Sequence, residues 1–199
     1  MTDLGSYKWT EVPIFLIFYD KLYLSLLSEE TMKVEWADAA CKTPFTFQEL
    51  KNPELMNYAK EHLSFQGVAK VDPKTPYSYL KVGDDFIHQL FPLLKKDHPE
   101  AKMLDYFSAK QPVGAHVTIA YSDERYAQAI KDKILSSATE LQFQFESAGL
   151  FKVAVFGKTI FALAVSSPGL TEFRLQEKLS EKLNYHGLLV PFHITIGIY

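Results

Sequence analysis

The sequence has little cysteine, no strong excess of charge of either sign and no long apolar run. Cys41 is the single cysteine among 199 residues, so a disulfide framework is excluded and a reducing, cytoplasmic compartment is expected. Without a local nucleophile motif, Cys41 itself is expected to be a buried thiol. The formal net charge of −3 argues against long duplex nucleic acid as a partner, because such binding requires a strongly basic face. A nucleotide or a short RNA end needs only a local pocket and remains compatible with this charge.

The longest apolar stretch near the start, VPIFLIFY at residues 12–19, is too short to span a bilayer. We expect a buried strand or short core segment there and no transmembrane segment, while contact with a membrane surface is a weaker alternative. The opening residues MTDLGSYKWTE also lack the basic region of a secretory signal. Hydrophobic residues make up 47% of the chain and charged residues 23%, as in an ordinary globular protein.

Hydrophobic periodicity and turn residues divide the chain at about residue 65. Residues 1–64 are expected to form an N-terminal extension that packs on the core, with one helix after Pro53. Residues 65–199 read as alternating strands and helices, which predicts an α+β domain. The expected helices follow Asp84 or Asp85, follow Ser122 as an N-cap to about residue 137, and run from Pro168 to about Lys182. The expected strands cover residues 67–71, 77–82, 116–121, 141–149, 152–156, 159–165 and 192–198.

Two strands carry nearly the same tetrapeptide, His-Val-Thr-Ile at 116–119 and His-Ile-Thr-Ile at 193–196. Random placement of these residue types would give about 0.07 occurrences of His-apolar-Thr-apolar in a chain of this composition. The β-branched residues around each threonine favour strands. On a strand, residues two apart point to one side, so each histidine shares a face with its threonine about 6.6 Å further along.

Side by side, two such strands would present two imidazoles and two hydroxyls to a single phosphate. One neutral histidine can take a proton from the nucleophile while the other, protonated, gives a proton to the leaving oxygen. The threonine hydroxyls can donate hydrogen bonds to the non-bridging oxygens. Histidine suits both duties because its ordinary pKa lies near neutrality. This scheme requires no metal and no cofactor.

The two motifs resemble the paired His-x-Thr-x motifs of the 2H (two-histidine) phosphoesterase superfamily. The resemblance covers about residues 65–199, and it implies a two-lobed α+β fold with a pseudo-twofold axis and antiparallel-rich sheets flanked by helices. It implies hydrolysis of a 2′,3′-cyclic phosphate or of a 2′-linked nucleotide or RNA end, without a metal. His116 and His193 would then be the acid–base pair, and Thr118 and Thr195 the phosphate ligands. Residues 1–64 match no family that we recognise.

Several alternatives accompany this interpretation. Each His-Thr pair alone is more often a locally bonded, partly buried pair, and a module of the same fold can bind a nucleotide or RNA end without cleaving it. The N-terminal segment can instead serve an interaction protein. By strand parity, Tyr199 shares the side of His193 and is a candidate for stacking on a base, whereas Tyr121 has the parity opposite to His116 and is expected to pack. The stretch FGKTIF resembles a phosphate-binding loop, but we expect a hairpin there.

Overall fold

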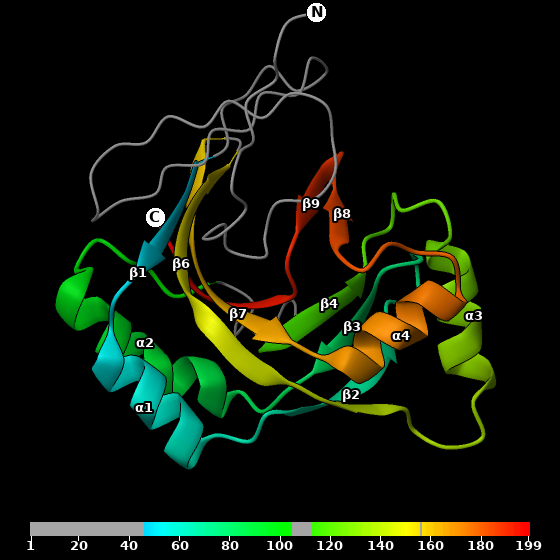
Figure 1. Ribbon diagram of the computed structural model, residues 1–199, viewed down its shortest axis with the longest axis horizontal. Coiled ribbons are helices and arrows are strands. Elements are labelled where there is room, and N and C mark those ends of the chain that lie inside the picture. Colours follow the sequence, from blue (N-terminus) through cyan, green and yellow to red (C-terminus); the bar gives the residue numbers. More distant parts are fainter. Residues whose placement is uncertain (1–45, 105–112, 156) are drawn as a thin grey trace, which may run out of the picture.

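The computed structural model describes residues 46–104, 113–155 and 157–199, and it places antiparallel sheets against helices (Figure 1). The mixed α+β class predicted from the sequence is confirmed. The apolar stretch at 12–19 and Cys41 lie outside the described residues. None of the helices within the described residues is long and apolar enough to cross a membrane.

The elements follow one another along the chain in two similar series. They are β1 (Thr46–Leu50), α1 (Pro53–His62), β2 (Gln66–Val71), β3 (Ser78–Lys81), α2 (Asp85–Asp97), β4 (His116–Ala120), α3 (Ala127–Ser136), β5 (Gln142–Gln144), β6 (Glu146–Val155), β7 (Lys158–Ser166), α4 (Pro168–Gln176), β8 (Leu183–Tyr185), β9 (Leu188–Val190) and β10 (His193–Ile198). Each series contains a helix, a hairpin, a second helix and a strand that begins with one of the two motif histidines. The second series also contains β5 and the β8–β9 hairpin.

Two four-stranded sheets and one small hairpin organise these strands. The first sheet has the order β1-β6-β7-β10 and the second has the order β4-β3-β2-β5, with every neighbouring pair antiparallel. The hairpin consists of β8 and β9. In each sheet the strand that carries a His-x-Thr-x motif is an edge strand, so one side of its backbone faces away from the sheet.

The two halves of the chain exchange elements with each other. Strand β1 from the first half pairs with β6, while β5 from the second half pairs with β2. The helices are distributed between the two sheets in the same way. Helices α1 and α2 pack on the first sheet, at β6 and β10 respectively. Helix α3 packs on the second sheet at β2 and β3, and α4 packs there at β5. In Figure 1, α1 and α2 accordingly lie together on one side of the molecule and α3 and α4 on the other.

This exchange places residues 46–64 within the packed body. All five residues of β1 pair with β6, from Thr46 opposite Ala154 to Leu50 opposite Leu150. In α1, the side chains of Leu55 and Ala59 are fully buried in the main core. Strand β1 and helix α1, which belong to the expected N-terminal extension, therefore pack on the rest of the described chain.

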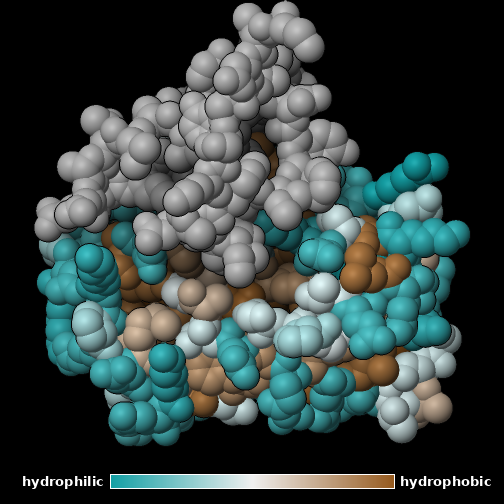
Figure 2. Space-filling view, in the orientation of Figure 1, coloured by the Kyte–Doolittle hydropathy of each residue, from teal (hydrophilic) through white to brown (hydrophobic). Residues whose placement is uncertain are grey.

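The core lies between the sheets and the helices, as the alternation of the motif strands predicts. Val117 and Ile119 of β4, and Ile194 and Ile196 of β10, are all fully buried. On the face shown in Figure 2, polar side chains lie over the two flanks of the molecule and apolar side chains gather between them. Burial of the four valine and isoleucine side chains of β4 and β10 supplies the main driving force that holds the two motif strands in place.

Two expected helix boundaries are wrong. The third helix starts at Ala127 and is not capped by Ser122, because Glu124 is buried and bonded to Arg174. The last helix ends at Gln176, since Lys178 adopts a left-handed φ of 63° and its amide bonds back to Leu175. This terminates the helix in the manner of a C-terminal turn. The residues up to Leu183 then lead into the β8–β9 hairpin.

Candidate functional site

The structure brings the two motif strands together. Cα atoms of β4 and β10 lie within 8 Å of each other although the strands belong to different sheets. The charge of a protonated His193 also lowers the pKa of His116. The two strands that carry the tetrapeptides therefore lie next to each other, where an edge of one sheet contacts an edge of the other.

Both motif strands carry a β-bulge at the same position. Thr118 pairs with Tyr79 and Ala120 with the adjacent Ser78, so Ile119 is the extra residue. In the other strand, Thr195 pairs with Ala162 and Gly197 with the adjacent Phe161, so Ile196 is extra. Bulges re-aim side chains and are frequent beside active sites. Since each bulge follows the threonine, the histidine and threonine of each motif keep a common face.

The second bulge changes the expected position of Tyr199. Beyond Ile196 the alternation of the strand is reversed, and the backbone of Tyr199 bonds to that of Thr159. Tyr199 is therefore on the side of the sheet opposite to His193, with 65% of its surface exposed. The parity argument that placed it beside His193 is wrong, because a sequence does not reveal a bulge.

The two histidines make the same hydrogen bond. Nδ1 of His116 lies 2.9 Å from the carbonyl oxygen of Gly114, and Nδ1 of His193 lies 2.9 Å from that of Pro191. A carbonyl oxygen only accepts, so Nδ1 carries the proton and donates in both rings. Nε2 is then the basic nitrogen of each neutral ring, which suits both of them for proton transfer at that atom.

The environment favours the neutral form of both rings. Burial lowers the pKa of His116, and the nearby charges of His193 and Lys81 lower it further, against the opposing effect of the bond to Gly114. Burial likewise lowers the pKa of His193, opposed by the bond to Pro191. In the ligand-free protein one ring is thus ready to accept a proton. A bound phosphate would favour protonation of the other, because an adjacent negative charge stabilises the imidazolium.

The two threonines have different surroundings. Thr118 is buried, and its Oγ1 lies 3.0 Å from the hydroxyl of Tyr77. Burial raises the pKa of Tyr121, and the neighbouring Thr118 opposes this rise. Tyr121 packs against the main core, as expected from the sequence, although β4 ends at Ala120 and Tyr121 leaves the alternation that placed it on the other face. Thr195 is half-buried and lies opposite Ala162.

Tyrosines line the β4 side of the site, whereas the β10 side is lined by small residues. The ring of Tyr79 stacks on Tyr77 at 5.7 Å and meets the edge of His116 at 5.7 Å. Tyr121 lies 5.0 Å from Tyr185 of the β8–β9 hairpin. On the other side, the β7 residues opposite His193 and Thr195 are Ala164 and Ala162. Sequence reasoning missed Tyr77 and Tyr79, although their alternation in YSYLKV is a signal that they share one face of a strand.

A lysine of β3 also belongs to the surroundings of His116. Lys81 pairs with His116 across the β3–β4 ladder. Its Nζ lies 2.6 Å from Asp84 Oδ1 and 2.8 Å from the carbonyl oxygen of Val113. This positive charge was not expected from the sequence, because the partner of each strand residue depends on the register.

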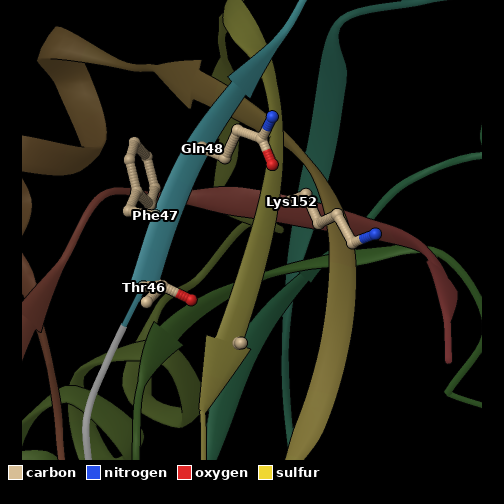
Figure 3. A pocket seen from close by; sticks show the side chains of 5 residues that line it. Thr46, Phe47, Gln48 and Lys152 are labelled. Carbon is tan, nitrogen blue, oxygen red and sulfur yellow. The ribbon is translucent and has the colours of Figure 1, made fainter. Parts of the chain in front are cut away.

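A separate small cavity lies away from the histidines. Figure 3 shows it on the paired strands β1 and β6, lined by Thr46, Phe47, Gln48, Lys152 and Ala154. Lys152 pairs with Phe161, whose side of the sheet is opposite to that of His193, and it bonds to Glu100 at 3.4 Å. Within the described ranges, no group of three or more histidine, cysteine or acidic side chains is arranged to hold a metal ion.

Comparison with protein families agrees with this geometry. The model of the Swiss Army Knife family of 2H phosphoesterase domains (2H-SAK) matches residues 78–199, which include both motif strands. Comparisons with curated proteins and with solved structures give no match. The family match covers more than half of the chain and contains both His-x-Thr-x motifs. The chain therefore belongs to the 2H phosphoesterase superfamily.

Proposed function

We propose that this protein is a metal-independent phosphodiesterase that hydrolyses a 2′,3′-cyclic phosphate or a 2′-linked nucleotide or RNA end. The observation that carries the proposal is the matched geometry of the two motifs. Both begin an edge strand, both have Nδ1 bonded to a carbonyl two residues earlier, and both are followed by a bulge. Two equivalent proton-transfer groups beside one another suit a reaction in which one group takes a proton from the nucleophile and the other gives a proton to the leaving oxygen.

The reaction would proceed by in-line attack of water on phosphorus. The neutral histidine takes a proton from the water at Nε2 as the new P–O bond forms. The protonated histidine gives its Nε2 proton to the leaving ribose oxygen as the other P–O bond breaks, which yields a phosphomonoester and a hydroxyl. Thr118 and Thr195 donate hydrogen bonds to the non-bridging oxygens, where negative charge must be held.

The tyrosines near His116 favour a nucleotide as the substrate over a phosphate ester without a base. Tyr77, Tyr79, Tyr121 and Tyr185 are all half-buried and lie on the side of His116. Aromatic faces next to a phosphate site suit the stacking of a base. In the part of the chain that the structure describes, the β7 residues opposite His193 and Thr195 are small.

The proposal is tested with a panel of 2′,3′-cyclic nucleotides, 2′,5′-linked dinucleotides and a 3′,5′-linked control, each assayed with EDTA. His116→Ala and His193→Ala should each lower kcat by about 10³-fold, because each variant lacks one proton-transfer group. His62→Ala is the matched control, since His62 is exposed on α1. Activity that survives both motif variants would exclude this site. Tight binding without turnover across the whole panel would instead identify a binding module of the same fold.

A further inference from the structure

An ion pair lies around the residues that lead into His116. Lys81 Nζ and Asp84 Oδ1 are 2.6 Å apart. Lys81 donates to the carbonyl oxygen of Val113 at 2.8 Å, and Asp84 Oδ1 accepts from the amide of Ala115 at 3.1 Å. The pair therefore holds the chain on both sides of Gly114, from the residue before it to the residue after it.

Gly114 fits between these two side chains only because it lacks a Cβ atom. An added Cβ would lie 2.1 Å from Lys81 Nζ and 2.3 Å from Asp84 Oδ1, closer than atoms can approach. Its φ of 64° also lies in the left-handed region that favours glycine. Both observations show that the ion pair and the backbone of Gly114 are fitted to each other.

The carbonyl oxygen of Gly114 accepts the hydrogen bond from His116 Nδ1, at 2.9 Å. In the second motif the equivalent carbonyl belongs to Pro191, whose ring fixes φ without help from other side chains. The same bond is thus accepted by the carbonyl of a proline at His193, and by the carbonyl of a glycine held between two charged side chains at His116.

We propose that Lys81 and Asp84 are positioning residues that fix the Gly114 carbonyl, and thereby hold His116 as the Nδ1-protonated tautomer with Nε2 as its basic nitrogen. The relevance of this positioning to catalysis rests on the proposed function. The tautomer of His116 can be measured without reference to that function. A general contribution to stability does not explain the pair. Its side chains are 33% and 47% exposed, and ion pairs at such sites add little to stability.

The test is ¹⁵N NMR of the histidine rings in the full chain, at alkaline pH where both rings are neutral and a change of pKa does not enter. Lys81→Met and Asp84→Ala should shift the His116 nitrogens toward a mixture of tautomers and leave those of His193 unchanged. Lys70→Met is the matched control, because Lys70 forms an exposed ion pair with Glu140 elsewhere, also at 2.6 Å. Lys81→Arg, which keeps the charge and a donor, should restore most of the wild-type tautomer.

Where turnover is measured, Lys81→Met and Asp84→Ala should each lower kcat by about 10-fold and change KM by less than 2-fold. The reason is that a fraction of the molecules then has His116 protonated at Nε2, without a basic nitrogen at that position. An unchanged His116 tautomer in both variants would overturn the proposal, as would an equal change at His193. A wild-type protein without phosphodiesterase activity would contradict the proposed function only, since the tautomer measurement still decides the role of Lys81 and Asp84.

Discussion

At the scale of single residues, the two histidines are alike in bonding and alike in their preference for the neutral form. Burial is the largest cause that lowers the pKa of both rings. A general acid–base pair requires one ring to be charged and the other to be neutral. The pH dependence of the reaction should therefore report these two environments directly.

Free-enzyme pKa values appear in the pH profile of kcat/KM. Since both histidine pKa values are lowered, both limbs of the bell should lie below the ordinary histidine value of about 6.5. The optimum should lie below that value too. A profile measured at constant ionic strength with a 2′,3′-cyclic nucleotide checks this expectation. An optimum above neutral pH would contradict the assignment of these two rings.

We expect the hydroxyl of Tyr77 to affect kcat by orienting the hydroxyl of Thr118. Tyr77→Phe keeps the ring but removes the group 3.0 Å from Thr118 Oγ1. The threonine hydroxyl then loses a partner that orients it, so kcat should fall by about 10-fold, the value of one hydrogen bond. Tyr58→Phe is the control, because its hydroxyl contacts Gln89 on the outer helices. Equal effects of the two variants would show that the loss is not local to Thr118.

At the scale of secondary-structure elements, Arg174 connects α4 to both motif strands. Its guanidinium is fully buried, pairs with Glu124 at 2.8 Å and donates to the carbonyl oxygen of Ile119, next to Thr118. It also lies over the ring of Phe192, next to His193, at 5.8 Å. Glu124 in turn accepts the amide of Tyr121 at 2.9 Å. One side chain thus fixes the end of β4 and the start of β10.

Arg174→Ala should lower the free energy of unfolding by about 3–5 kcal/mol, because Glu124 would remain buried without its partner. Urea denaturation followed by circular dichroism measures this difference. Arg125→Ala serves as the control, since Arg125 is exposed on the same connection, and its effect should stay within about 0.5 kcal/mol. Similar losses in both variants would mean that the buried ion pair is not what holds α4 to β4.

The sequence predicted those elements whose residues carry a local signal. The two tetrapeptides, with β-branched residues around each threonine, indicated both motif strands and the faces of His116 and His193 correctly. Pro168 indicated the start of α4. The end of that helix was wrong because Leu179 and Leu183 continue the helical spacing, but Leu183 is buried as the first residue of a strand.

What the sequence did not predict depends on register and on distant partners. Tyr77 is 41 residues from Thr118, and Arg174 is 50 residues from Glu124. No local pattern connects residues at such separations. The bulges at Ile119 and Ile196 are equally hidden, because an isoleucine at a bulge is indistinguishable in sequence from one in a regular strand.

At the scale of the whole molecule, the first helix packs in the same core as the two motif strands, so we expect it to unfold together with them. Leu55→Ala removes a fully buried side chain from α1 and should lower the free energy of unfolding by about 2–5 kcal/mol. Leu135→Ala, at a position 62% exposed, should change it by less than about 0.5 kcal/mol. Thermal unfolding should keep a single transition in both. A separate early transition in Leu55→Ala would show that α1 unfolds apart from the rest.

The exchange of β1 and β5 between the halves has a consequence for how a substrate arrives. Separating the first half of the chain from the second would require the ladders β1–β6 and β2–β5 to break, and α2 to leave β10. The two motif strands, one from each half, are therefore brought together as the chain folds. Such a centre acts as a ready-made template, which avoids reorganisation of its dipoles during each turnover.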